Sequence, residues 1–509
     1  MGSMAMSKEK RGGMSTLLLG IRMFFNNPLS RVILRALSHE IEVNGRRQAI
    51  VYKALELYAG VDTTSCFTAR FASHLMKGII KFFMVLASGN EEEARNALRD
   101  PALIRGLTVV FQGLALYGAT VPQKLPAPFQ VVWNFTNMCN LACKHCYQRA
   151  GRPLPNELNY EEKLRVIEQL DKANVPSLAF SGGEPTIHPH FLDMVYEASR
   201  RGMYVSVATN GMRFADIKFA EKAKKAGLRY VEVSIDSADP KKHDEFRGIV
   251  GCWEKAVKGL RNVAKLGLST GMAVTLTRMN VDEVNDLINL AEDVGANRII
   301  FFNFIPVGRG LENAEELDLN PLERERVLRK LARENSKRKI EVLSTAPQYG
   351  RTVLQVSRGQ EISPTHFYVG SDPAVRALTE YIGGCGAGRI YCGIQPDGTV
   401  IPCVFMPIPV GSLRKETFWS IWITSQLMLD LRDREKLRGN GFCKKCPYKY
   451  ICGGCRARAY AYTGDYLEGD PGCLYNIILW KKVKEKLRSL KNLESLQTTS
   501  WQSPNLVFK

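Results

Sequence analysis

Residues 137–151 read NMCNLACKHCYQRAG and place three cysteines, Cys139, Cys143 and Cys146, with three and then two residues between them; Tyr147 follows directly. A structural zinc site uses four protein ligands, commonly in two pairs. Three neighbouring thiolates with no fourth beside them instead suit a 4Fe–4S cluster in which one iron stays open to an external ligand. On this stretch alone, a zinc site completed elsewhere, for instance by His145, is the alternative.

Outward from this loop, short apolar runs alternate with charged helical stretches such as residues 159–174 and 188–202. The apolar runs predict six strands, at residues 130–136, 177–182, 204–211, 230–236, 270–276 and 298–306. This βαβ rhythm is typical of a parallel sheet. We therefore expect an α/β fold with a partial (βα)6 barrel over residues 126–310. The motifs follow the strands, at the end of a barrel where active sites lie.

The cysteine spacing with its aromatic neighbour resembles the radical S-adenosylmethionine (SAM) enzyme family. Further marks of that family follow in order: SGGEPTIHP at 181–189, VATNG at 207–211, VSIDS at 233–237 and then HDEFRG. The resemblance implies that Cys139, Cys143 and Cys146 hold a 4Fe–4S cluster covered by Tyr147. It also implies that SAM is cleaved there to methionine and a 5′-deoxyadenosyl radical, which abstracts hydrogen from an unactivated carbon.

The same resemblance implies the residues that contact SAM. Glycine lets backbone carbonyls approach a ligand, a carboxylate suits an ammonium group, and short polar side chains accept hydrogen bonds from ribose hydroxyls. Arginine can hold a carboxylate by a two-pronged contact. The expected SAM contacts are Tyr147, Gly182, Gly183, Glu184, Asn210, Ser234, Asp236 and Arg247.

A second cysteine-rich segment, residues 383–478, contains Cys385, Cys392, Cys403, Cys443, Cys446, Cys452, Cys455 and Cys473. It is similar to the SPASM extension of radical SAM enzymes, which implies auxiliary 4Fe–4S clusters. Cys392 is additional to that pattern, and the Cys452–Cys455 pair is one residue short. Eight thiols suffice for two four-ligand sites, so structural zinc and a mononuclear, rubredoxin-like iron stay open as alternatives. Cys66 and Cys252 stand apart and are expected to be buried thiols.

The remaining segments are expected to be mainly helical. Residues 1–125 form an apolar, basic, helical domain, in which Asn27 and Pro28 start a helix that continues to Val43. The uncharged run 106–123 reaches the lower limit for a membrane span but holds three glycines and a proline, which favours a buried helix. Residues 311–382 form connecting helices and a loop, and 479–509 form a basic amphipathic helix and tail.

The net charge of +19 indicates an anionic partner. Because no zinc finger of the Cys-Cys-His-His kind and no RNP aromatic signature is present, we expect no nucleic acid partner. The basic, apolar amino-terminal helices suit an anionic membrane surface. No secretory signal sequence precedes them, so the expected location is cytoplasmic and peripheral at the membrane.

The whole chain, amino-terminal helices included, resembles the archaeal tetraether lipid synthases, which are radical SAM enzymes. This resemblance implies C–C bond formation between terminal carbons of the isoprenoid chains of archaeal ether lipids (tetraether formation). It also implies an electron donor such as a ferredoxin or flavodoxin. Two other functions stay open: a radical SAM/SPASM maturase that modifies a peptide or protein, and an iron–sulfur scaffold or electron carrier without catalytic activity.

Overall fold

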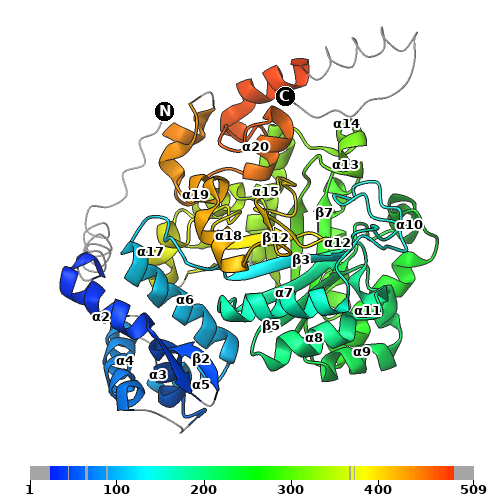
Figure 1. The fold of residues 1–509 in the computed structure, drawn as a ribbon. Helices are drawn as coiled ribbons and strands as arrows, with labels where there is room; N and C mark the ends of the chain where they lie inside the picture. Colours follow the sequence, from blue (N-terminus) through cyan, green and yellow to red (C-terminus); the bar gives the residue numbers. More distant parts are fainter. Residues whose placement is uncertain are drawn as a thin grey trace.

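The computed structural model describes residues 23–486, apart from 24, 44, 63–66, 87–89, 366–367, 372 and 440. Its centre is a ten-stranded sheet with helices on its outer face (Figure 1). In spatial order the strands are β14 (Gly411–Ser412), β13 (Thr399–Ile401), β12 (Tyr391–Ile394), β3 (Gln130–Thr136), β4 (Ser177–Gly182), β5 (Tyr204–Thr209), β6 (Tyr230–Ser234), β7 (Ser269–Leu276), β8 (Arg298–Asn303) and β9 (Glu341–Ser344). Every neighbouring pair from β12 to β9 is parallel, whereas β13 and β14 are antiparallel additions.

The α/β class and the barrel are confirmed, and the six expected strands correspond to β3 to β8. The outer helices are α7 (Tyr160–Lys172), α8 (Phe191–Arg200), α9 (Ile217–Lys225), α10 (Pro240–Arg247), α11 (Cys252–Lys265) and α12 (Val284–Asp293). Helix α7 begins with a reciprocal cap, in which Asn159 and Glu162 each accept a hydrogen bond from the other's backbone N–H. Strands β9 and β12 extend the parallel sheet beyond the six expected strands. The sequence did not predict them because runs of four residues carry too little periodicity to identify a strand.

The amino-terminal domain contains α2 (Pro28–Ser38), β1 (Glu40–Val43), β2 (Arg46–Ala49), α3 (Ile50–Ala59), α4 (Phe67–Leu86), α5 (Glu91–Ala97) and α6 (Pro101–Tyr117). The expected helix up to Val43 is wrong: α2 ends at Ser38 and a hairpin follows. Gly45 has a left-handed backbone with φ of 72°, which suits a tight turn, and Glu42 lies opposite Arg47 across the two strands.

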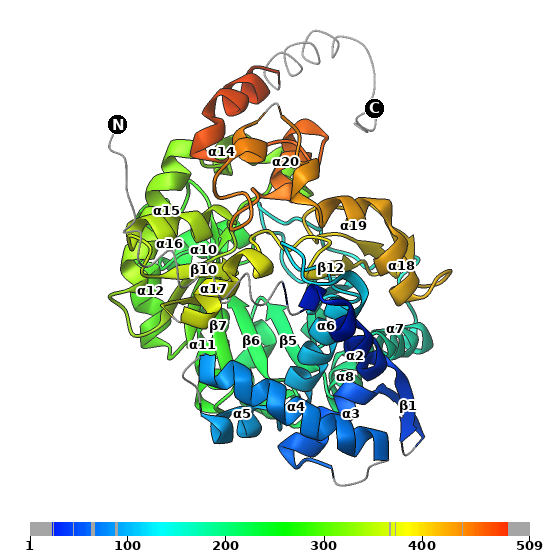
Figure 2. The same ribbon diagram turned by 90° about the vertical axis from the view of Figure 1, so that its left-hand side faces the viewer.

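Helix α6 fills most of the uncharged run 106–123 and is largely buried, as expected, with only Pro101, Leu103 and Leu116 exposed. No helix among the described residues is long and apolar enough to cross a bilayer. Arg105 of α6 attaches this domain to the barrel: its guanidinium donates to the Val175 carbonyl at 2.9 Å and to Asp171 at 2.8 Å. Figure 2 shows α4 and α5 below β5, β6 and β7, at the amino ends of these strands.

Residues 309–382 contain α13 (Arg309–Glu312), α14 (Ala314–Leu317), α15 (Pro321–Asn335), α16 (Gln348–Val356), β10 (Ile362–Thr365), β11 (Tyr368–Gly370) and α17 (Pro373–Ile382), besides β9. The cysteine-rich segment adds α18 (Phe418–Thr424), α19 (Gln426–Leu431) and α20 (Arg456–Thr463). Residues 477–486 are helical. The rest of the expected carboxyl-terminal helix and tail, and Cys66, lie outside the described residues.

Candidate active site

The barrel encloses a cavity of about 1260 Å³ that is lined by residues from both ends of the strands. The inward positions of β4 to β7 carry many small side chains, among them Ser177, Ala179, Ser181, Ser206, Ala208, Ser234 and Ala273. Alternate residues such as Leu178 and Val233 point outward into the apolar layer beneath the helices. Bulky branched side chains fill the interior of a closed eight-stranded barrel, whereas these small ones leave the interior open.

The cysteine loop lies at the carboxyl end of β3 and forms part of the cavity wall. Cys139, Cys143 and Cys146 all line the cavity and share an apolar cluster with Leu141 and Met212. Burial raises the pKa of Cys139 to about 12. Thiolates at these positions therefore need positive charge beside them, which an iron–sulfur cluster supplies.

Two residues that follow β8 hold the loop and were not foreseen from the sequence. Arg309 donates to the Cys143 carbonyl at 3.2 Å and to the Ala150 carbonyl at 2.7 Å, while Asn313 donates to the Lys144 carbonyl at 2.8 Å. The loop is irregular, so helix or strand hydrogen bonds do not satisfy these carbonyl groups. The Arg309 and Asn313 side chains supply the missing donors. Their position directly after the last expected strand was the available signal.

Gly182 and Gly183 line the cavity at the end of β4. A Cβ at Gly182 would lie 2.7 Å from the Thr136 carbonyl oxygen, and one at Gly183 would collide with the Met138 carbonyl. Gly182 also has φ of 111°, in the region that favours glycine. The two glycines therefore let β4 approach the backbone of the cysteine loop.

Glu184 is buried and accepts four hydrogen bonds, from Thr186 N and Oγ1, from Thr209 Oγ1 at 2.8 Å and from Asn210 N at 2.7 Å. These bonds connect the ends of β4 and β5. Burial raises its pKa, which the hydrogen bonds partly offset. Glu184 lines the cavity, as expected for a SAM contact, and also fixes the local backbone.

Asn210, Ser234 and Arg247 line the cavity, but Asp236 is not among its lining residues. Asp236 is fully buried and pairs with Arg247 at 2.6 Å. The Arg247 guanidinium also lies 3.9 Å from the Cys143 sulfur, so it adds positive charge beside the thiols. The structure thus places Asp236 behind Arg247, where it orients the guanidinium.

Tyr147 lies between the cysteine loop and the cysteine-rich region. Its hydroxyl donates to Asn134 Oδ1 at 2.8 Å and lies 3.1 Å from Ser181 Oγ, and burial raises its pKa. Its ring packs edge-on against Phe405 at 4.9 Å between centroids. Tyr147 and Phe405 both line the cavity that the three cysteines line.

Seven of the eight carboxyl-terminal cysteines form two groups. The open group, Cys385, Cys403 and Cys455, lines the main cavity, and the Tyr391 hydroxyl donates to the Cys403 sulfur. The closed group surrounds a separate cavity of about 20 Å³ and comprises Cys443, Cys446, Cys452 and Cys473. Three thiols leave one coordination position free on the cavity side, whereas four complete a ligand set.

Cys392 is not brought to either group, so its predicted role as a ligand lacks support. Cys392 follows Tyr391 directly on β12, and successive side chains of a strand point to opposite faces. Because Tyr391 lines the cavity, Cys392 faces the opposite side. There it packs in the apolar layer of the barrel, and burial raises its pKa.

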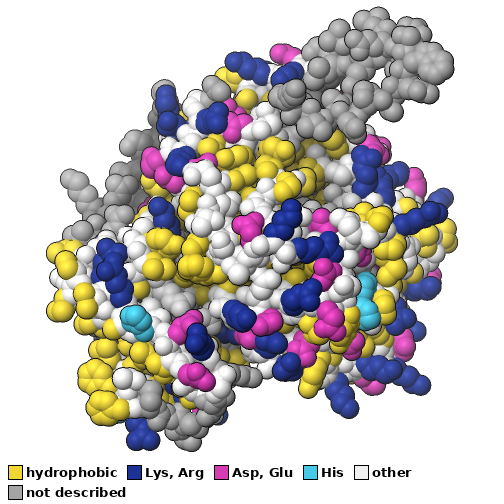
Figure 3. Space-filling model, in the orientation of Figure 1, with side chains coloured by type: hydrophobic (Ala, Val, Ile, Leu, Met, Phe, Trp, Pro, Cys, Tyr) yellow, Lys and Arg dark blue, Asp and Glu magenta, His cyan; other side chains and the backbone are white. Residues whose placement is uncertain are grey.

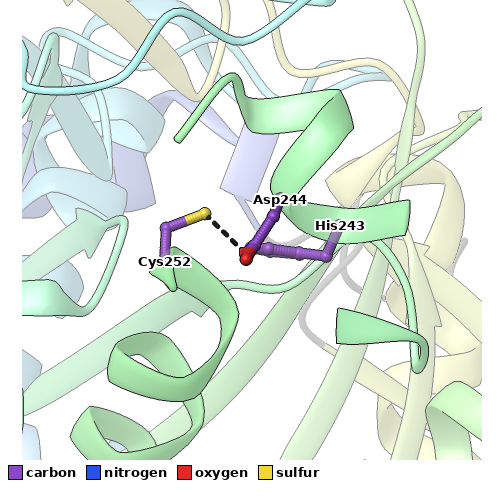
Figure 4. Close-up of side chains that lie close together, drawn as sticks. All are labelled: His243, Asp244 and Cys252. Atoms are coloured by element: carbon purple, nitrogen blue, oxygen red, sulfur yellow. Dashed lines mark hydrogen bonds between the residues drawn. The ribbon is translucent and has the colours of Figure 1, made fainter. Parts of the chain in front are cut away.

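The thiols of all three groups are too far apart for a single metal ion. In the part of the chain that the structure describes, one set of three candidate ligand atoms lies within 4.8 Å, and it consists of His243, Asp244 and Cys252 (Figure 4). A single tetrahedral ion with bonds of about 2.3 Å to sulfur requires its ligand atoms to lie this close to one another. The wider cysteine groups therefore fit polynuclear clusters better than zinc or a rubredoxin-like iron.

The His243, Asp244 and Cys252 set serves the local fold. Asp244 accepts from Gly251 N at 2.6 Å and from Trp253 N at 2.8 Å, and the Cys252 thiol donates to it at 3.2 Å. His243 Nδ1 accepts from Asp236 N. The bonds to Asp244 hold the start of α11, and Cys252 is a buried thiol, as expected.

Comparisons with known proteins agree with this geometry. A radical SAM superfamily model matches residues 133–291, and a SPASM model, described as an iron–sulfur cluster-binding domain, matches residues 385–447. The chain is similar to an AdoMet-dependent heme synthase of Methanosarcina barkeri, with 35% identity over 354 residues that cover 69% of this chain and 97% of the relative. It is 30% identical to the mycofactocin maturase MftC of Mycobacterium tuberculosis over 357 residues, 69% of this chain and 84% of the relative.

Among solved structures, Streptococcus suis SuiB bound to S-adenosylmethionine has a TM-score of 0.59 and 16% identity, covering 85% of this chain and 95% of SuiB. Native anSMEcpe with bound AdoMet has a TM-score of 0.52 and 18% identity, covering 72% of this chain and 98% of the other. These similarities show the fold. The named relatives concern heme synthesis and maturation, so the resemblance to tetraether lipid synthases depends on the sequence features alone.

Proposed function

We propose that this chain, which belongs to the radical SAM superfamily and carries a SPASM domain, joins terminal carbons of two isoprenoid chains of membrane ether lipids. The barrel binds SAM and a 4Fe–4S cluster, and the SPASM domain binds auxiliary iron–sulfur clusters. When bound, the barrel cluster supplies the electron that cleaves SAM. Each new C–C bond replaces two C–H bonds and consumes two SAM and two electrons, which yields two methionines and two 5′-deoxyadenosines.

The observation that carries the proposal is the length and apolar lining of the cavity. It extends from the cysteine loop past the amino ends of the strands to amino-terminal helices, where Leu55, Met76, Leu107, Phe111 and Leu114 line it. A strand of seven residues, such as β3, spans about 20 Å. One leaflet of a bilayer contributes about 15 Å of hydrocarbon, so a lipid chain matches this length.

The amino-terminal domain lies outside both family models. The heme synthase match spans nearly the whole relative but leaves about three-tenths of this chain unmatched, and both family models begin after residue 130. The helices that lengthen the cavity precede both models. They are where a specific property of this chain, rather than of the superfamily, is expected.

The residues of the chain have separate roles in this proposal. Arg309, Asn313 and the glycines Gly182 and Gly183 hold the cysteine loop in place. The small inward side chains leave room for an alkyl chain. Tyr147 and Phe405 pack together in the cavity wall, which limits the access of solvent and of the hydrogen donors that it carries to a primary carbon radical.

A second function is favoured by the relatives themselves. The similarity to a heme synthase and to a maturase supports modification of a tetrapyrrole or a peptide, and the volume of the cavity, about 1260 Å³, suits such a substrate as well. Mass spectrometry of small molecules that copurify with the protein separates these functions. Ether lipid is expected; a tetrapyrrole or a precursor peptide, with no lipid, contradicts the lipid proposal.

The turnover experiment supplies SAM, a reductant and a diphytanyl ether lipid. We expect 5′-deoxyadenosine and coupled lipid in a ratio of two to one, because two hydrogens leave for each bond. Formation of 5′-deoxyadenosine with a peptide or tetrapyrrole, but not with lipid, would favour the second function. Absence of any SAM cleavage would favour an electron carrier.

The proposal also places the protein at a membrane surface. Helices α2 and α4 contain no Asp or Glu and expose Leu29, Val32, Phe67 and Phe71, the last two at 84% and 69%. Figure 3 shows hydrophobic side chains with Lys and Arg over this part of the molecule, at the lower left. Apolar side chains among cations suit an anionic lipid surface.

Flotation with phosphatidylglycerol vesicles tests this surface. Binding should weaken with added salt and fall in the double variant Phe67→Ser and Phe71→Ser. The matched control is Val250→Ser, which removes an exposed apolar side chain between α10 and α11 and should bind as the wild type does. Equal binding of all three proteins contradicts the assignment.

A further inference from the structure

Arg389 is a buried cation in the cavity wall that pairs with no carboxylate among the described residues, although the Cys385 thiol of the open group lies near it and as a thiolate would offset part of its charge. Its side chain is 1% exposed, its Nη2 donates to the Gly383 carbonyl at 2.6 Å, and its Nε and Nη1 have no acceptor. Within the described part of the chain, no carboxylate pairs with it. A buried, unpaired charge is costly, so such a group points to a ligand.

The other arginines of the cavity wall differ from Arg389. Arg247 pairs with Asp236 at 2.6 Å, and Arg298 pairs with Glu341 at 2.9 Å. Two further buried guanidiniums, Arg432 and Arg434, lie near Arg389. Both donate to backbone carbonyls, and Arg432 also donates to the Met428 sulfur at 3.9 Å. The surroundings of Arg389 are therefore strongly positive, and two of its nitrogens, Nε and Nη1, have no acceptor.

The sheet register places Arg389 far from the cysteine loop. Strand β12 runs parallel to β3, with Tyr391 opposite Gln130, the first residue of β3. Arg389 precedes β12, whereas Cys139 follows β3, so the two lie at opposite ends of this strand pair. The intervening strand spans about 20 Å.

The cavity wall reaches the protein surface on α17, the helix that ends directly before Gly383. Leu378 of α17 lines the cavity and is 38% exposed, and Gly383, which Arg389 contacts, directly follows α17. A polar headgroup could remain near this part of the surface while its chain extends along the barrel.

We propose that Arg389 binds the phosphate of a lipid substrate, whose alkyl chain extends along the barrel to the cysteine loop. This inference rests on the proposed function and adds the position and charge of the headgroup. Guanidinium matches phosphate in charge and hydrogen-bonding geometry. The apolar surroundings strengthen that contact by excluding water.

The test compares binding of diphytanylglycerol phosphate and of diphytanylglycerol, in neutral detergent, to the cluster-loaded protein. The wild type should bind the phosphate form at least about tenfold more tightly, as expected for a hydrogen-bonded charge. Arg389→Gln should lose this preference while still binding the neutral lipid, and Arg389→Lys should keep part of it. Arg298→Gln is the matched control and should retain the preference.

Equal binding of the two lipids by the wild type overturns the headgroup assignment and does not bear on the lipid substrate. A preserved preference in Arg389→Gln overturns it as well. The third contradicting outcome is an Arg389→Gln variant in which the electron paramagnetic resonance spectrum of the auxiliary clusters differs from that of the wild type while the lipid preference is unchanged. Arg389 would then balance the charge of the open group and would not bind phosphate. Binding of neither lipid by the wild type overturns the proposed function itself.

Discussion

The open group and the closed group of cysteines are neighbours in the same domain, yet their surroundings differ. Cys452 of the closed group and Cys455 of the open group are three residues apart. The open group has three thiols on the wall of the main cavity, while the closed group has four thiols around a small cavity of their own. A free position beside a substrate cavity suits chemistry, and a complete ligand set suits structure or electron transfer.

Shared contacts join the two groups. Asp470 accepts a hydrogen bond from Cys455 N at 2.8 Å, while its own N–H donates to the Cys443 sulfur at 3.5 Å. Arg434 donates to the Cys385 carbonyl at 2.7 Å and packs against Gly453. The difference between the groups therefore comes from cavity access and not from distance along the chain.

The largest effect is expected from removing the barrel cluster, which tests whether the open or the closed group of cysteines can replace it. Changing Cys139, Cys143 and Cys146 to alanine should abolish 5′-deoxyadenosine formation and remove about four iron atoms, because these thiols hold one cluster. Iron at the two auxiliary groups should remain. Chromatography of the reaction products and iron analysis measure both outcomes.

The control for this variant is Cys392→Ala, which should leave iron content and SAM cleavage unchanged because Cys392 lies in the apolar layer. Loss of a cluster in that control would return Cys392 to the ligand set. Continued SAM cleavage in the triple variant would mean that an auxiliary group performs the reaction.

The next effect concerns the open group alone. Cys403→Ala should still form 5′-deoxyadenosine, because the barrel cluster is unchanged. It should lose most of the coupled lipid, because the cluster of the open group loses a ligand. Tyr391→Phe removes the donor to the Cys403 sulfur and keeps the thiol, so a smaller loss is expected. Product ratios by mass spectrometry measure the effect; equal loss of SAM cleavage and coupling would contradict the distinction.

A smaller effect concerns stability. Cys443→Ala should lower the melting temperature more than Cys403→Ala, because the closed group joins irregular segments whose folding is coupled to metal binding. Differential scanning calorimetry of matched, cluster-loaded preparations measures it. A larger fall in Cys403→Ala would assign the structural role to the open group.

The smallest effect is a pH dependence in the wall of the open cavity. Burial raises the pKa of Glu232 to about 7, and Tyr230 donates to it at 3.2 Å. Because the folded-state pKa is above the unfolded value, its contribution to stability is full below about pH 4.5 and is lost as the pH rises through 7. Glu232→Gln should remove this slope and stabilise the protein at pH 8 by up to about 3 kcal/mol.

Denaturant unfolding at pH 5 and pH 8 checks this prediction. The variant should gain stability relative to the wild type only at the higher pH. Identical slopes in the two proteins would mean that Glu232 titrates normally and that this part of the cavity holds water.

Local patterns determined the barrel and its cluster loop. The periodicity of β3 to β8, the Asn159 cap and the spacing of Cys139, Cys143 and Cys146 are properties of short segments, so they are visible in one sequence. The small inward residues of β4 to β7 were also visible, although their consequence, an open interior, required knowing which face points inward.

Contacts between distant segments were not predictable in this way. Whether a cysteine joins a group depends on which loops meet: Cys385 and Cys403 reach Cys455 across at least 52 positions of sequence, while Cys392, between them, faces the other side of a strand. The addition of β9 and β12 to the sheet, and the pairing of Asp236 with Arg247, likewise depend on long-range packing. Sequence alone determined the superfamily and its cofactor chemistry, because those depend on residues close together in the chain. Tertiary structure decided the partition of the thiols, the length of the cavity and the unpaired charge of Arg389, because each depends on what distant segments bring beside it.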